Sequence, residues 1–152
     1  MKIITLVCTA SLLLAQFTYA AAEEKANPLT TALGATGAQA VFSNYMAIAE
    51  LADLFGAKAY DKGKVGELAT MYGKLTEGAK ESLTDLIDSG KLNEGDTAAI
   101  REMVVINDLL TKMAGCIVSY AKESNADNEA AYDKNRQKAW KSISKFLGIK
   151  DE

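Results

Sequence analysis

The chain contains no histidine and very little cysteine or proline: of 152 residues, two are Cys and one is Pro. Without His there is no Ser-His-Asp or Cys-His catalysis, no His-ligated haem and no Glu-x-x-His pair of the di-iron helical bundles. The two Cys residues form no Cys-x-x-Cys motif, and no glycine-rich phosphate loop occurs. The sequence therefore predicts a non-catalytic protein that holds no metal and no other cofactor.

The amino-terminal segment has the features of a signal peptide. Lys2 supplies a positive charge, and Ile3 to Phe17 is a mostly apolar run without charge. Thr18 and Ala20 then place small residues at the two positions that a signal peptidase reads. We therefore predict export, to the periplasm or the extracellular space.

Residues 1–20 are the predicted signal peptide, with cleavage after Ala20 or Ala22, and residues 21–152 are the predicted single domain. An uncleaved membrane anchor is the alternative, since this segment is nearly long enough to span a bilayer. The net charge of −3, with both signs interspersed, favours a soluble protein. We expect no nucleic-acid partner and no stable membrane insertion after cleavage.

The segment from Met103 to Tyr120 carries the clearest structural pattern. Its apolar residues are spaced alternately three and four apart, which places them on one stripe of an α-helix. They are Met103, Ile106, Leu110, Met113, Ile117 and Tyr120. This stripe predicts a helix that packs along neighbouring helices.

Three further stretches repeat this spacing, at about residues 28–55, 62–89 and 125–147, and the central helix extends over about 96–123. The expected inward residues of the first are Ala38, Val41, Tyr45, Ile48, Ala52 and Phe55. Those of the second are Val65, Leu68, Tyr72, Leu75, Ala79, Ser82 and Leu86. Those of the last are Tyr132, Arg136, Ala139, Ile143 and Phe146.

Short polar segments separate the four stretches, and each offers a helix cap. Asn27, Asp61, Asp96, and either Asn125 or Asp127 can cap the four helix starts. No stretch shows the period-two alternation of a β-strand. The sequence predicts an all-α fold, an up-down-up-down antiparallel four-helix bundle. A three-helix array with a loose first helix is the alternative.

A few polar residues lie on or beside the predicted apolar stripes at similar depth in the bundle. Asn44, Tyr45, Tyr72, Asn107 and Arg136 would form a polar pocket, in which the Arg136 guanidinium binds a small anionic ligand. The structural alternative is that the asparagines fix the helix register while Arg136 extends its charged end outward.

Other residues point to association with a protein. Phe42 and Met46 face away from the main stripe of the first helix and could form an interface. Cys116, the one cysteine left after cleavage, is either a buried thiol or forms an intermolecular bridge. We therefore predict an exported, non-catalytic protein that associates with a protein partner or with itself. The alternative is the small-anion binder.

Overall fold

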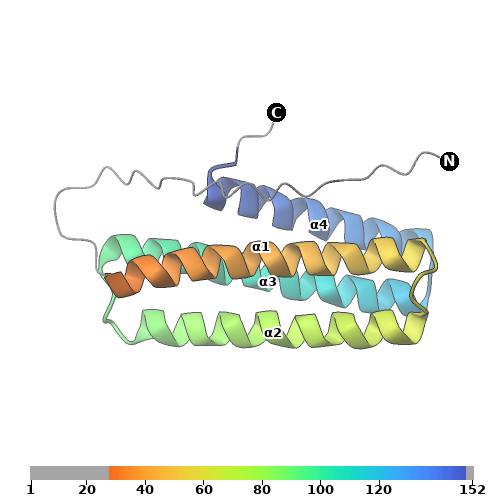
Figure 1. The fold of residues 1–152 in the computed structure, drawn as a ribbon, viewed down its shortest axis with the longest axis horizontal. Helices are drawn as coiled ribbons and strands as arrows, with labels where there is room; N and C mark the ends of the chain where they lie inside the picture. Colours follow the sequence, from red (N-terminus) through yellow and green to blue (C-terminus); the bar gives the residue numbers. More distant parts are fainter. Residues whose placement is uncertain (1–27, 150–152) are drawn as a thin grey trace.

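The computed structural model describes residues 28–149, which form four α-helices joined by short loops (Figure 1). Helix α1 spans Pro28–Gly56, α2 spans Lys62–Asp88, α3 spans Glu94–Lys122 and α4 spans Ala126–Leu147. The described part contains no β-strand, so the predicted all-α class is confirmed. The predicted signal peptide lies outside the described residues.

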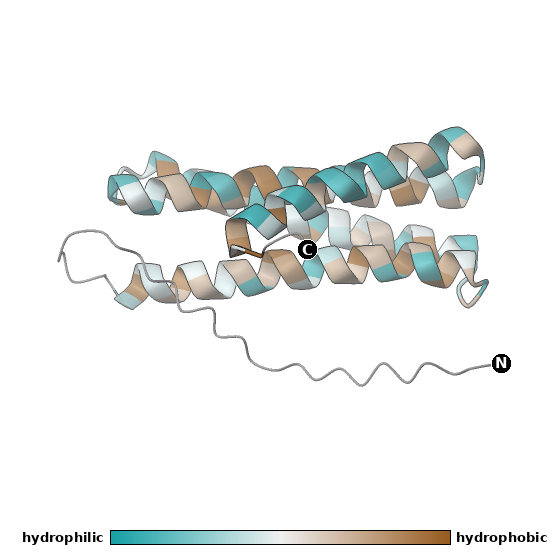
Figure 2. Ribbon diagram, turned by 90° about the horizontal axis from the view of Figure 1, so that it is seen from above, coloured by the Kyte–Doolittle hydropathy of each residue, from teal (hydrophilic) through white to brown (hydrophobic). Residues whose placement is uncertain are grey.

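Consecutive helices run in opposite directions, which confirms the up-down-up-down four-helix bundle (Figure 1). Helix α3 contacts all three other helices, and α1 also contacts α2 and α4. The alternative with a loose first helix is therefore wrong. Within residues 28–149, α2 and α4 make no contact with each other. Helix α4 lies obliquely across the bundle, with a largely hydrophilic outer face (Figure 2).

The central position of α3 follows from its sequence. All but one of its predicted stripe residues are buried, and Tyr120 is half-buried, packed edge-on against the ring of Phe55. Helix α3 is long and apolar enough to span a membrane by length and composition alone. In the bundle, this apolar surface forms the core that the other helices cover. Burial of each such large side chain contributes about 1.5–3 kcal/mol.

Polar side chains cap three of the helices. Asp61 accepts a hydrogen bond from the Lys64 backbone N–H at 2.8 Å at the start of α2, as predicted. Asn93 rather than Asp96 caps α3, because its side-chain oxygen accepts from the Asp96 N–H at 2.7 Å. Asn125 caps α4. The predicted cap Asn27 lies outside the described residues.

Helices α1 and α3 approach closely at Gly37. A Cβ atom added to Gly37 would overlap the sulfur of Met103, a fully buried side chain of α3. Glycine at this position therefore allows the Met103 side chain to pack directly against the α1 backbone. The glycine costs about 1 kcal/mol of helix propensity relative to Ala. The contact that it permits explains its presence inside a helix.

Helix α2 is rotated about its axis relative to the prediction. Leu75 and Ser82 were expected to face inward, but both are exposed, and Thr76 is completely buried instead. The face of α2 toward α3 consists largely of small residues, which let the two helices come close. A Cβ atom on Gly73 would lie 3.6 Å from the Cβ of Ala114. This close packing leaves the larger Leu75 outside.

Candidate functional site

Asn107, one of the predicted pocket residues, is buried within α3. Its side-chain amide donates a hydrogen bond to the Met103 carbonyl one turn earlier, at 2.9 Å. The Asn107 carbonyl in turn accepts from the Thr111 hydroxyl at 3.0 Å. These bonds hold Asn107 within its own helix.

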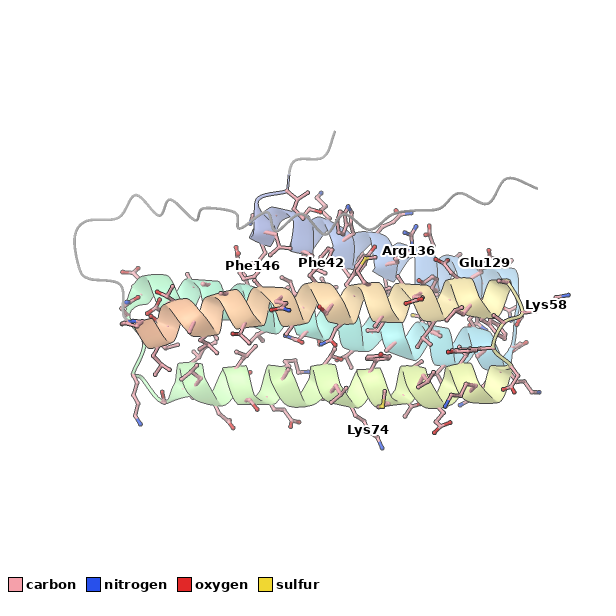
Figure 3. The ribbon with its side chains drawn as sticks, viewed as in Figure 1. Phe42, Lys58, Lys74, Glu129, Arg136 and Phe146 are labelled. Atoms are coloured by element: carbon pink, nitrogen blue, oxygen red, sulfur yellow. The ribbon has the colours of Figure 1, made fainter. Side chains whose placement is uncertain are left out.

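Tyr45 and Arg136 meet between α1 and α4. The Tyr45 ring is buried and stacks against Trp140, with ring centroids 5.5 Å apart. Arg136 donates two hydrogen bonds to Asp133 on its own helix, at 2.8 and 3.2 Å. The Asp133 carboxylate raises the pKa of the Arg136 guanidinium, with a smaller contribution from nearby Tyr45. The Arg136 side chain is 42% exposed, so its charge lies between Asp133 of the same helix and solvent (Figure 3).

The remaining predicted pocket residues, Asn44 and Tyr72, are half-buried. Throughout residues 28–149, every buried side-chain nitrogen or oxygen atom has a hydrogen-bond partner within the protein. The buried polar atoms of the interior are therefore satisfied without a ligand. These contacts give the polar group a structural role, and a small-anion pocket stays a prediction.

The predicted interface residues Phe42 and Met46 are exposed, by 37% and 50%. Phe42 lies on the side of α1 that faces α4 (Figure 3). Cys116 is a free, half-buried thiol, and the Asn135 side-chain amide donates to its sulfur at 3.4 Å. It borders a small groove of about 300 Å³ between α3 and α4, apart from Phe42 and Met46 on α1. That Phe42, Met46 and Cys116 form an interface stays a prediction.

A larger groove of about 880 Å³ lies between the amino-terminal half of α2 and the end of α3. We call it the α2–α3 groove. Its apolar lining comes from Met71, Leu75, Val118 and Ala121, beside two glycines of α2, Gly63 and Gly66. Met71 and Leu75 are 45% and 55% exposed. Large apolar side chains that line a groove in this way are typical of a site that another molecule covers.

Lysines border the α2–α3 groove. Lys62, Lys74 and Lys122 line it together with Glu67. The Glu67 carboxylate lies 3.6 Å from the ammonium of Lys64, so an ion pair already offsets its charge. The groove is thus apolar in the middle and cationic at its edge, although the whole chain is acidic. Lys74 extends from α2 away from the other helices (Figure 3).

Comparison of the chain with protein-family models, with curated proteins and with solved structures finds no match. Fold and site geometry therefore carry the functional argument. Within residues 28–149, no group of three or more His, Cys, Asp or Glu side chains is placed to hold a metal ion.

The sequence alone does not reveal the α2–α3 groove, because its apolar spacing assigns Leu75 to the core and leaves Met71 outside the predicted stripe. One signal was present: Met71 lies one turn before Leu75, so the two large apolar residues share a side of the helix at the edge of the predicted stripe.

Proposed function

We propose that this protein is an exported binding protein that associates with another protein surface through the α2–α3 groove. The observation that carries the proposal is the exposure of Met71 and Leu75 in a groove with glycines beside them. Glycines let a partner backbone approach closely, and the two large side chains supply the apolar area that association buries. Such a groove suits an amphipathic helix, which binds by inserting its apolar side chains.

The proposal places the activity in binding and not in catalysis. The chain has no His, and its acidic and basic side chains lie mostly on solvated helix faces. We also propose that the protein works outside the cytoplasm, on the strength of the signal-peptide pattern in residues 1–20. Mass spectrometry of the protein from its native cells tests this: a mature chain that begins after Ala20 or Ala22 is expected, and a chain that retains Lys2 would contradict export by cleavage.

Site-specific photo-crosslinking in the native cells tests the groove. A photoreactive amino acid at position 75 is expected to give a discrete crosslinked protein product. The matched control is position 105, because Val105 is 56% exposed, as Leu75 is to 55%, yet lies outside the groove. Met71→Glu is expected to abolish the product at position 75 by placing a charge in the apolar contact. Equal products at both positions, or none at 75, would refute the groove as a binding surface.

A further inference from the structure

We propose that the outer face of α4 binds the surface of a lipid bilayer that carries anionic headgroups. This inference is independent of the α2–α3 groove, because within residues 28–149 α4 makes no contact with α2. It starts from a row of exposed lysines, which we call the α4 lysine face. Its members follow one another at intervals of four, three and four residues: Lys134, Lys138, Lys141 and Lys145.

The α4 lysine face points away from the rest of the bundle. At about 100° per residue, the four lysines fall within about 60° of one another around the helix axis. Tyr132, Ala139 and Ile143, which are buried against the other helices, lie on the opposite side of α4. The outer face of this helix is largely hydrophilic (Figure 2). The lysines therefore form one outward row, about 16 Å long at about 1.5 Å per residue.

The charge of the α4 lysine face is not neutralised by neighbouring carboxylates. Residues 134–149 contain five basic residues and no Asp or Glu, in a chain whose net charge is −3. Within residues 28–149, Lys134, Lys138 and Lys141 take part in no ion pair. Lys145 lies 3.6 Å from Glu102 of α3, but both side chains are exposed, so this pair is weak.

Two carboxylates lie near the amino-terminal end of this face and leave its charge in place. Asp133 lies beside the face, where it accepts hydrogen bonds from Arg136 and Gln137. Asp127 is on the same side as Lys134, but two turns earlier, about 10 Å along the axis. It belongs to the first turn of α4, where a negative charge suits the positive end of the helix dipole. The cationic surface therefore begins at Lys134 and continues to the end of the helix.

The shape of this surface favours a flat anionic partner over a small anion. Neither of the two grooves described above is lined by any of the four lysines. Lysines one turn apart on an outward helix face cannot surround one small ligand, but they can contact several headgroups of a bilayer at once. Ile149, which is 42% exposed just after the end of α4, supplies an apolar side chain that can enter the interface one turn beyond Lys145. A soluble polyanion would leave Ile149 without a role.

Sedimentation with lipid vesicles tests the proposal. The probe is the mature chain, whose first residue the mass spectrometry described above defines. It is expected to sediment with vesicles of phosphatidylcholine that contain about one-third phosphatidylglycerol, and to stay in solution with phosphatidylcholine alone. Higher salt is expected to weaken the binding, because it screens exposed charges. Equal binding to both kinds of vesicle would overturn the proposal.

Two double variants with the same change in charge locate the contact. Lys138→Gln/Lys141→Gln is expected to weaken binding about 25-fold, since each lysine near an anionic bilayer strengthens binding about fivefold. The control is Lys58→Gln/Lys74→Gln, two exposed lysines away from α4 (Figure 3), which is expected to weaken binding less than about twofold. Glutamine and lysine have similar helix propensities, and circular dichroism checks each fold. Equal losses in the two variants would overturn the α4 lysine face as the contact.

Three further measurements separate a bilayer from other partners. Ile149→Ser is expected to weaken vesicle binding at least about threefold, and unchanged binding would overturn the insertion of Ile149. If the chain binds heparin through Lys138 and Lys141 but binds no vesicles, the face recognises an acidic polymer and the bilayer proposal is overturned. Binding to neither also overturns it. Leu75→Glu is expected to leave vesicle binding unchanged, so the result is independent of whether a protein binds the α2–α3 groove.

Discussion

The hydrogen bond between Thr76 and Thr111 gives a sharp test of how α2 packs against α3. The two hydroxyl oxygens are 2.8 Å apart. Thr111 can also donate to the Asn107 carbonyl at 3.0 Å, and Thr76 to the Tyr72 and Gly73 carbonyls at 3.0 Å. Each hydroxyl carries a single proton, so one donates across the helices and the other donates back into its own helix.

Replacement of either threonine by valine keeps the side-chain shape and removes this cross-helix bond. In Thr76→Val, the remaining Thr111 hydroxyl still donates to the Asn107 carbonyl, so no donor is left without a partner. The expected cost is therefore that of one neutral hydrogen bond, about 0.5–1.5 kcal/mol. The same holds for Thr111→Val. In the double variant the bond is lost only once, so its cost is expected to fall short of the sum of the two single variants by about 1 kcal/mol.

Urea unfolding followed by circular dichroism measures the four free energies of this cycle. The control cycle pairs Thr111→Val with Thr70→Val, since the Thr70 hydroxyl is exposed and donates only to the Gly66 carbonyl of its own helix. That cycle is expected to be additive within about 0.5 kcal/mol. If the Thr76 and Thr111 changes were equally additive, the cross-helix bond and the rotation of α2 that produces it would be refuted.

Four other substitutions follow from the same structure. Leu110→Ala, in the core, is expected to lower the free energy of unfolding by about 2–5 kcal/mol. Leu75→Ala, measured on dilute monomer, is expected to change it by less than about 0.5 kcal/mol. Similar losses in the two variants would contradict the exposure of Leu75. Gly148→Ala is expected to cost about 1 kcal/mol in thermal unfolding, because Gly148 ends α4 with a φ of 66° that disfavours a side chain. The Lys112 ammonium lowers the pKa of Asp108 in the folded chain, so this stabilisation is present above about pH 4 and is lost as the pH falls through the lowered pKa. Asp108→Asn is expected to flatten that part of the acid-unfolding curve, and an unchanged curve would rule out the contribution.

The positions of the helices could be predicted because two independent signals agree at their ends. Polar caps such as Asp61 and Asn125 coincide with breaks in the apolar spacing, so loops and helices separate clearly. The α3 stripe was predictable for a different reason. Its large side chains form one regular stripe, and a stripe of bulky residues on a single side of a helix identifies the buried side.

The rotation of α2 could not be predicted from apolar spacing, because size and burial run opposite to each other in this helix. Ala69, Gly73 and Thr76 face α3, where close approach requires small side chains, while Met71 and Leu75 remain outside. Hydrophobicity alone assigns the larger residues to the core. The α2–α3 groove is lined by two of these exposed side chains, Met71 and Leu75, so it is not recognised when Leu75 is assigned to the core. For this reason the sequence pointed to Phe42 and Met46 as the interface instead.

The sequence predicts where the polar residues of the interior lie on their helices, but not which groups their side chains reach. Asn107 was expected near the core and is buried there, but its amide bonds to a carbonyl of its own helix rather than to a ligand. Arg136 follows the spacing of a core residue, yet its long side chain reaches Asp133 and solvent from that position. Spacing locates a Cα atom on a helix face; it does not fix where a long charged side chain ends.

Because α2 and α4 do not contact each other, they lie on two flanks of the bundle, and each packs on α3 more extensively than on α1. Either outer helix can detach while the other stays packed on α3, so partial opening is possible without global unfolding. Hydrogen exchange is expected to be slowest in the middle of α3, whose amides open only when the whole fold does. Helix α4, with 22 residues against 29 in α3, is expected to exchange at its own, faster rate. Helix α3 is thus the shared packing surface for α2 and α4, each of which can detach without the other.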